Sequence, residues 1–182
     1  MKEIIAQSFG IVAMIFIVFS FQQRKRNMAI LLQLIGGALF CVNYTMLGAI
    51  VGGLLNFIAV IRGLVFLNKE KLKADSPIWL IIFISLFLTS YVLSFCVFDK
   101  APTTKNFIFE ILPVIGMIAS TLSFRKDDAK SIRRYGFISS PCWLTYNIVN
   151  FSIGAIITEV LNLISIVIGT IRFDIKKKKD LN

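Results

Sequence analysis

Seven long apolar segments dominate this sequence and limit what it can fold into. They cover roughly residues 4–21, 28–47, 50–67, 78–98, 107–124, 135–151 and 153–173. Each is near the ~20 residues that a helix needs to cross a ~30 Å hydrocarbon core. A helix also satisfies its own backbone hydrogen bonds where no water is available. With 57% hydrophobic and 16% charged residues, the chain is predicted to be an all-α membrane protein with seven transmembrane helices.

The basic residues predict the orientation of these spans. Sixteen of the 20 Lys and Arg residues follow spans one, three, five and seven, in the runs 24–26, 69–73, 125–134 and 172–179. Because basic loops stay in the cytoplasm, the N-terminus is predicted outside and the C-terminus inside. The first segment is predicted to be a retained span rather than a cleaved signal peptide, since its basic run follows it.

Short turns and a proline mark several helix ends. Gly48-Ala49 separates the second and third segments, and the stretch from Phe151 to Gly154 separates the last two, so both pairs are predicted to form tight hairpins. Ser76-Pro77 provides a suitable start for the fourth helix.

Composition also bears on the class of function. The net charge of +10 arises from residues at predicted helix ends, so it indicates membrane orientation rather than nucleic-acid binding. The chain has no histidine, and Cys41, Cys96 and Cys142 lack metal-ligand spacing. We expect no metal site, no disulfide and no cofactor. Without histidine, paired carboxylates or a nucleophile–base motif, we also expect that the protein is not an enzyme.

The first and last three spans resemble each other, which predicts an internal repeat. The matches are Met14-Ile15 with Met117-Ile118, Ser20-Phe21 with Ser123-Phe124, Gly48-Ala49-Ile50 with Gly154-Ala155-Ile156, and Leu55-Asn56 with Leu161-Asn162. The predicted organisation is a three-helix bundle over 1–74, a linker helix over 75–105, and a second bundle with a basic tail over 106–182. A single linker helix makes the two bundles parallel, and transporters with such repeats bind substrate between the halves.

The second bundle resembles the YgjV family of bacterial inner-membrane proteins. The matching stretches are Leu112-Pro113-Val114-Ile115-Gly116, Cys142-Trp143 with Asn147, Ser152-Ile153-Gly154, Glu159 and Ile171-Arg172-Phe173. The resemblance implies a bacterial cytoplasmic-membrane location and names no activity.

The 3-1-3 organisation resembles SWEET sugar transporters and their relatives, the PQ-loop and PnuC-type proteins. SWEET proteins carry an asparagine in the third helix of each triplet, and the resemblance gives Asn56 and Asn162 that role. It places Phe40 and Tyr146 at the aromatic position of each second helix, where tryptophan is usual. No Pro-Gln pair follows the first span of either triplet.

Several intramembrane side chains are candidates for a solute site. Asn56 and Asn162 are predicted at matching depth, either as solute ligands or as interhelical hydrogen bonds. Glu159 lies three residues from Asn162, on the same helix face. It would bind a cation, a proton or substrate, or serve as an interfacial acid. Trp143 and Tyr146 share a face, for stacking on a ring or for packing.

Other residues have simpler interpretations. Glu110 is placed at the start of the fifth helix, where an acid favours the helix dipole. Arg62 is expected to extend to the cytoplasmic surface or to pair with a buried acid. Pro113 and Pro141 interrupt predicted helices, as hinges or static kinks. Lys176–Lys179 are expected to contact anionic lipid heads.

The sequence therefore predicts a transporter or facilitator of a small polar solute such as a sugar or nucleoside. The alternative is a non-transporting accessory or interaction protein. The expected partners are the lipid bilayer and that solute, with no nucleic acid. The identity of the solute, ion coupling and homo-oligomerisation are left open.

Overall fold

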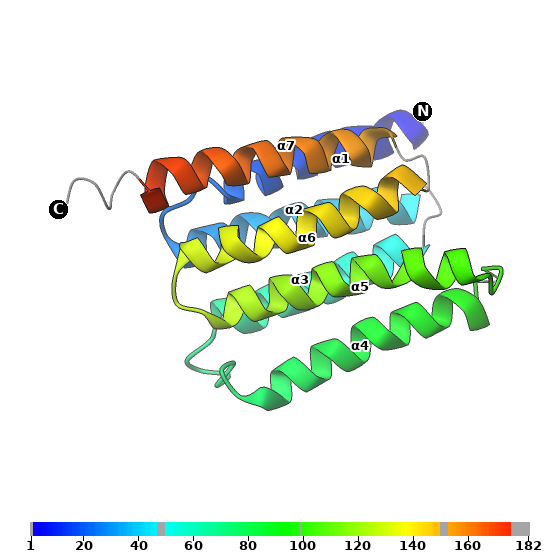
Figure 1. The fold of residues 1–182 in the computed structure, drawn as a ribbon, viewed down its shortest axis with the longest axis horizontal. Coiled ribbons are helices and arrows are strands. Elements are labelled where there is room, and N and C mark those ends of the chain that lie inside the picture. Colours follow the sequence, from blue (N-terminus) through cyan, green and yellow to red (C-terminus); the bar gives the residue numbers. More distant parts are fainter. Residues whose placement is uncertain (1, 47–49, 99, 150–152, 176–182) are drawn as a thin grey trace.

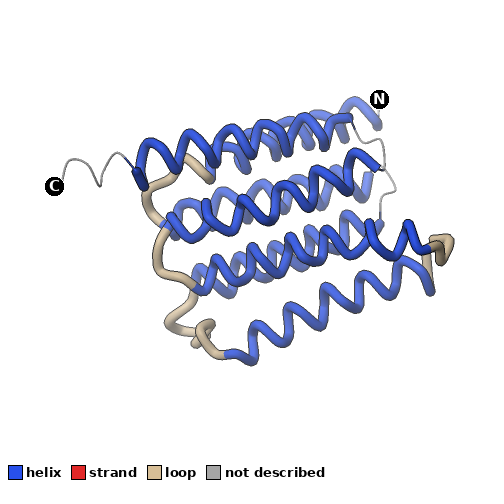
Figure 2. The backbone as a smooth tube through the Cα atoms, in the orientation of Figure 1, coloured by secondary structure: helices blue, strands red, loops and turns tan. Residues whose placement is uncertain are grey.

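The computed structural model describes residues 2–46, 50–98, 100–149 and 153–175, and every regular element in these ranges is helical (Figure 2). The elements are α1 Lys2–Ser20, α2 Arg26–Met46, α3 Ile50–Leu67, α4 Pro77–Cys96, α5 Thr104–Arg125, α6 Ala129–Val149, α7 Ile153–Thr170 and the π-helical η1 Ile171–Ile175. The all-α prediction is confirmed. The predicted turn at Gly48-Ala49, residues 151–152 of the turn predicted over 151–154, and the tail Lys176–Lys179 lie outside the described residues. Ile153 and Gly154, the rest of the second predicted turn, belong to α7.

Four described helices are long and apolar enough to cross a membrane. They are Arg26–Met46, Pro77–Cys96, Thr104–Arg125 and Ala155–Ile175. Ile4–Ser20 and Gly52–Leu67 form shorter apolar helices. Because all seven helices run side by side across one body (Figure 1), the chain is a multi-pass helical membrane protein, and the count of seven spans remains a prediction.

Helix starts follow capping residues more closely than hydropathy. Ser76 caps α4 at Pro77, as predicted, by accepting a hydrogen bond from the Ile78 amide. The sixth helix begins at Ala129, six residues before the predicted apolar segment. Its first turn is stabilised because the Asp128 carboxylate accepts hydrogen bonds from the Ser131 amide at 2.6 Å and hydroxyl at 2.9 Å. Basic residues therefore belong to the helix, although they lower its hydropathy.

The helices form two layers of three with α4 at one edge (Figure 1). Helix α2 packs between α1 and α3 in one layer, and α6 packs between α5 and α7 in the other. Across the layers, α1 contacts α7, α2 contacts α6, and α3 contacts α5. Exchanging α1 with α5, α2 with α6 and α3 with α7 leaves this set of contacts unchanged. Helix α4 packs against both α3 and α5.

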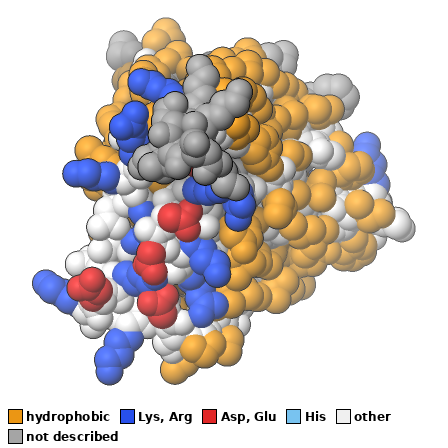
Figure 3. Space-filling model, turned by 60° about the vertical axis from the view of Figure 1, so that its left-hand side comes forward, with side chains coloured by type: hydrophobic (Ala, Val, Ile, Leu, Met, Phe, Trp, Pro, Cys, Tyr) orange, Lys and Arg blue, Asp and Glu red, His pale blue; other side chains and the backbone are white. Residues whose placement is uncertain are grey.

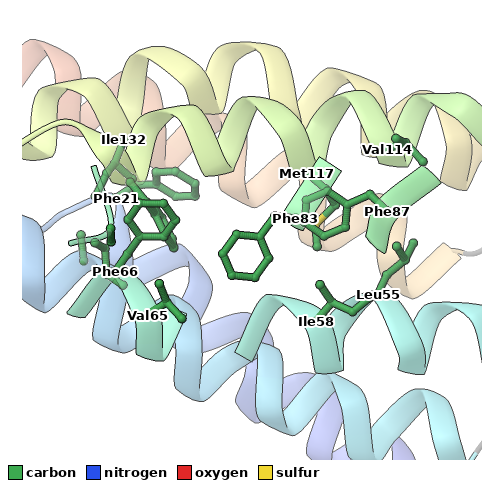
Figure 4. Close-up of a cluster of buried hydrophobic side chains, with 14 of the residues drawn as sticks. Phe21, Leu55, Ile58, Val65, Phe66, Phe83, Phe87, Val114, Met117 and Ile132 are labelled. Carbon is green, nitrogen blue, oxygen red and sulfur yellow. The ribbon is translucent and has the colours of Figure 1, made fainter. Parts of the chain in front are cut away.

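An aromatic column attaches α4 to the two layers (Figure 4). Phe66 of α3 lies 6.2 Å from Phe83 of α4 and 6.0 Å from Phe124 of α5, measured between ring centroids. Phe83 also stacks on Phe87, one turn further along α4. All four rings are buried. Helix α4 is therefore a packed part of the bundle.

The two ends of the bundle differ in charge. The loops 21–25, 68–76 and 126–128, together with η1, lie at the end that we call the basic end (Figure 2). Lys100 and Lys105 lie toward the opposite end.

Large apolar side chains such as Ile4, Ile78 and Ile81 are exposed on the outer surface. That surface suits contact with lipid rather than water.

Candidate functional site

Two carboxylates, Glu110 of α5 and Glu159 of α7, each lie at the seventh residue of their helix, and the first of them has a cationic partner. Glu110 of α5 is buried and forms an ion pair with Lys100. It also forms a hydrogen bond with Tyr146 of α6. The helix begins at Thr104, so Glu110 lies beyond the first turn. The predicted role at the helix dipole is therefore wrong, and the carboxylate instead links α5, α6 and the loop before α5.

The second carboxylate, Glu159 of α7, lies where α6 and α7 meet. It forms hydrogen bonds with Ser140 of α6 and with Asn162, whose Nδ2 lies 3.4 Å from Oε2 of Glu159. Asn162 is only 4% exposed, and its Oδ1 has no hydrogen-bond partner. The predicted shared face of Glu159 and Asn162 is confirmed. We call Ser140, Glu159 and Asn162 the Glu159 cluster.

Tyr44 of α2 brings the other layer close to this cluster. It lies within electrostatic range of Glu159 and of Tyr146. Its ring packs over α3, since a Cβ at Gly52 would lie 3.0 Å from the ring. Tyr44 and Ser140 were both missed at the sequence level, because an isolated hydroxyl in an apolar segment gives no periodic signal.

Asn56 has a different environment from Asn162. Its Nδ2 donates to the Gly52 carbonyl of its own helix at 2.9 Å, and its Oδ1 lies near Gly37 of α2. Helices α3 and α7 both have 18 residues, and Asn56 is the seventh of α3, as Glu159 is of α7. Counted from the first residue of each helix, Asn162 is three residues further along α7 than Asn56 is along α3. Their match in depth within a membrane remains a prediction.

The predicted aromatic residues pack within their own halves. Phe40 stacks on Tyr44 of the same helix with ring centroids 5.8 Å apart. Trp143 and Tyr146 contact each other edge to face at 6.0 Å, which confirms their shared helix face. Trp143 also lies against Gly116 of α5, where a Cβ would be 3.0 Å from the indole. A role for Phe40, Trp143 and Tyr146 in binding a solute remains a prediction.

The two predicted hinge prolines lie inside continuous helices. Pro113 is buried within α5, and Pro141 is exposed within α6. Each removes one backbone donor from its helix. The carbonyl of Pro141 accepts a hydrogen bond from Thr145 at 2.8 Å. A hinge at Pro113 or Pro141 remains a prediction.

Arg133 of α6 is the best-connected cation at the basic end. Its guanidinium binds both carboxylate oxygens of Asp174, with N–O distances of 2.9 and 2.6 Å. It also donates to the carbonyls of Phe21 and Gln23 just after α1. Both side chains of the ion pair are buried. Arg133 therefore joins the end of α7 to the end of α1.

Arg26 of α2 has the corresponding role for the other two helices. It donates to the carbonyls of Phe66 at the end of α3 and of Phe124 at the end of α5, and to the Lys126 carbonyl at 2.6 Å. Arg26 of α2 therefore joins the end of α3 to the end of α5, as Arg133 of α6 joins the end of α7 to the end of α1. Cations at helix C-termini satisfy carbonyls that lack intrahelical partners.

Lys69 joins two loops at the same end. Its Nζ contacts the Arg125 carbonyl at 2.6 Å, Asp127 at 2.6 Å and Asp75 at 2.9 Å. Burial alone would lower the pKa of Lys69, but hydrogen bonds and charges from Asp127 and Asp75 outweigh it and raise that pKa. The hydrogen bond from Lys69 lowers the pKa of Asp127.

Arg62 of α3 is buried between the layers, contrary to the prediction that it extends to the surface. Its Nη1 donates to the Met117 carbonyl at 3.0 Å and to Thr121 Oγ1 at 3.2 Å, and its guanidinium lies 4.8 Å from the Phe124 ring centroid. Its Nε has no partner. The ion pairs identified among the described residues do not include Arg62.

The seam between α1 and α7 is also closed by hydrogen bonds. Ser165 donates to the Val18 carbonyl at 2.6 Å, and Gln22 donates to both the carbonyl and the hydroxyl of Ser165. Ser165 is the thirteenth residue of α7, as Arg62 is of α3. The α3–α5 and α1–α7 contacts between the layers are therefore each bridged by a hydrogen bond from the thirteenth residue of α3 or α7.

The basic end carries an open basin of about 1350 Å³. Figure 3 shows Lys, Arg, Asp and Glu side chains gathered at this end. It is lined by charged residues of the three loops and η1, including Arg24, Lys71, Asp128 and Arg172. Guanidinium groups of Arg24 and Arg172 lie 4.9 and 5.0 Å from the Phe173 ring centroid. Within the ranges that the structure describes, no group of three Cys, Asp or Glu residues is placed to hold a metal ion.

Comparison with known proteins identifies the family. A model of the family described as bacterial inner membrane protein, Imp-YgjV, matches residues 4–177. No curated protein and no solved structure gave a significant match. The match covers nearly the whole chain and agrees with its apolar helices, so location in a bacterial inner membrane is supported by two observations. The chain belongs to the Imp-YgjV family of bacterial inner membrane proteins.

Proposed function

We propose that this protein is a transporter or facilitator of a small polar solute, with the Glu159 cluster as its binding site. The observation that carries the proposal is a carboxylate within the bundle beside a buried amide oxygen that has no partner. Polar groups in transmembrane helices are costly and usually face a cavity, a partner or an ion path. The cluster lies between helices of the second half, with Tyr44 of the first half nearby.

The relation between the two layers supports a two-repeat transporter. We infer that α1–α3 and α5–α7 are the parallel bundles predicted for 1–74 and 106–182, with α4 as the linker. Their helix neighbours are the same under exchange of the halves, and repeats of this kind rock against each other around a central site. The SWEET-like organisation is part of this proposal.

The hydrogen bonds at the basic end suggest which side is closed in this conformation. Arg26, Arg62, Lys69 and Arg133 all join one layer to the other near that end. Opening a path there requires these contacts to separate. With the N-terminus outside, as the loop charges predict, the closed side is the cytoplasmic side.

The test measures water access to the cluster and needs no knowledge of the solute. In a background where Cys41, Cys96 and Cys142 are replaced by serine, Asn162→Cys is expected to react with a membrane-impermeant thiol reagent added outside intact cells. Phe87→Cys, in the fully buried aromatic column, is the control and is expected to stay unmodified. If Asn162→Cys does not react from either side of the membrane, the cluster lies on no solute path and the proposal is wrong.

Uptake into proteoliposomes then identifies the solute from sugars, nucleosides and amino acids. Asn162→Ala is expected to reduce uptake at least tenfold. Asn56→Ala is the matched control, because Asn56 bonds to its own helix, and it is expected to retain uptake. The opposite ranking would move the site to α3.

Orientation has its own test. Ala101 is exposed in the loop before α5, and in the same cysteine-free background Ala101→Cys is expected to be labelled only from outside. Labelling only from the cytoplasm would reverse the proposed topology.

The charged basin at the basic end favours a second candidate, a non-transporting accessory or interaction protein. Its size and mixed charges suit a polar partner at the membrane surface. In either case we propose that the protein is not an enzyme. The accessory role would be favoured if Asn162→Cys does not react and if the protein binds a partner whose binding depends on Arg24 and Arg172.

A further inference from the structure

The carboxylates of Glu110 and Glu159, which lie within α5 and α7, have unequal charge partners. Glu110 has the ammonium group of Lys100 beside it. Glu159 has hydrogen bonds only, and the ion pairs found among the described residues do not include it. A carboxylate at this depth needs a counter-ion, a proton or water. Glu159 therefore has an unmet requirement that Glu110 does not have.

The groups around Glu159 supply oxygen atoms. The Ser140 hydroxyl is buried and bonds to the Glu159 carboxylate. Asn162 contributes a buried amide oxygen that is without a partner, and a buried acceptor of this kind destabilises the fold unless something binds it. A carboxylate, an amide carbonyl and a hydroxyl are the ligands that hard cations such as sodium prefer over nitrogen or sulfur.

We propose that Glu159, Asn162 and Ser140 form a binding site for a monovalent inorganic cation, with sodium as the probe. This inference deepens the proposed function, since it names the charge class of ligand for the same cluster. One carboxylate balances one positive charge, and the Asn162 oxygen gains the partner that it lacks. Because Ser140 belongs to α6 and the other two residues to α7, an occupied site also joins these helices.

Thermal unfolding of the whole chain in detergent tests the proposal at constant ionic strength, with sodium chloride replaced stepwise by N-methylglucamine chloride. The wild-type Tm is expected to rise with sodium and then saturate. At a concentration 100-fold above Kd, the rise is expected to be about 5–10 °C. Equilibrium binding of radioactive sodium should saturate over the same range.

Glu159→Gln is expected to abolish both the Tm response and sodium binding. Asn162→Ala and Ser140→Ala are each expected to raise Kd about tenfold or more. Glu110→Gln is the matched control, because it removes a carboxylate that already has Lys100 as its partner, and it should keep the sodium response. If Glu159→Gln does not fold, Asn162→Ala, which retains the carboxylate, decides the question through Kd.

Three results would overturn the proposal. In the first, the wild-type Tm does not change with sodium and radioactive sodium does not bind. A Tm that responds to pH alone belongs to this case and would assign a proton to Glu159. The second is an undiminished response in Glu159→Gln, and the third is an unchanged Kd in Asn162→Ala. If sodium binds but Asn162→Cys is not modified, this inference is upheld and transport is refuted. If Asn162→Cys is modified but sodium does not bind, this inference is refuted and the proposed solute path is upheld.

Discussion

The basic end and the Glu159 cluster handle buried charge in opposite ways. At the basic end, Arg133 has a carboxylate and two carbonyls around it, and Arg26 contacts the ends of two helices. In the Glu159 cluster, a carboxylate has only hydrogen bonds, and the oxygen of Asn162 has no partner. Charge at the basic end therefore joins the two layers, whereas we propose that the Glu159 carboxylate binds a ligand.

Helix direction explains why cations suit the basic end. Helices α1, α3, α5 and α7 all end there, so four sets of C-terminal carbonyls face it. These carbonyls lack intrahelical donors and carry partial negative charge. Basic residues placed by the positive-inside rule thus also serve as helix caps.

The largest predicted effect is at Arg133. Arg133→Ala leaves the buried Asp174 carboxylate without its partner, and breaking such a pair typically costs about 3–5 kcal/mol. Unfolding by SDS in mixed micelles should show this loss. Lys130→Ala, one turn earlier on the exposed surface, should stay within about 0.5 kcal/mol. A loss as small in Arg133→Ala would mean that the basic end does not join the layers.

Gly169 tests how closely the layers approach at that end. A Cβ there would lie 2.5 Å from the Phe21 carbonyl oxygen and 3.0 Å from Arg133 Cδ. Gly169→Ala is expected to destabilise the fold by about 1–3 kcal/mol through overpacking. Gly37→Ala is the control, because its nearest neighbour would be 3.8 Å away. It should be neutral or stabilising by up to about 1 kcal/mol through helix propensity. Equal effects of both substitutions would contradict the tight contact.

The Lys69–Asp127 pair should give a smaller, pH-dependent effect. Asp127 is largely exposed, so Asp127→Asn should cost no more than about 1 kcal/mol. Because the folded pKa of Asp127 is lowered, its contribution is present above the unfolded pKa of about 3.9 and is lost as pH falls through the folded value. The Lys69 contribution is lost only as pH rises through its raised pKa, above about 10.4. Unfolding of wild type and Asp127→Asn should differ at pH 6–8 and converge under strong acid; a constant difference would contradict the ion pair.

Arg62 should show the smallest effect on stability, although it is buried. It has no carboxylate partner among the identified ion pairs, and its Nε is unsatisfied. Arg62→Met keeps the length of the side chain without a charge to bury, so stability should change by less than about 1 kcal/mol or should rise. The same SDS titration measures it, and a loss above about 3 kcal/mol would place Arg62 with Arg133 as a structural cation.

The length and hydropathy of the apolar segments were enough to predict the class of protein and most of its helices. Apolar length and the absence of water in lipid leave only helices for these segments, and Ser76-Pro77 started α4 where expected. The spacing of Glu159 and Asn162 also fixed their shared face, since that depends on helix geometry alone. Helix α6 began earlier than predicted because a cap at Asp128 extends a helix through charged residues that hydropathy excludes.

Which polar residues are paired depends on how the helices pack against one another. The predictions for Glu110 and Arg62 were wrong because their partners come from separate elements. Glu110 pairs with Lys100 and Tyr146, and Arg62 donates to Thr121. Likewise, Asn56 and Asn162 look equivalent in sequence, but they have different hydrogen-bond partners. A hydrogen bond within a helix depends on local spacing, whereas a contact between helices depends on how they pack, and no single segment encodes that.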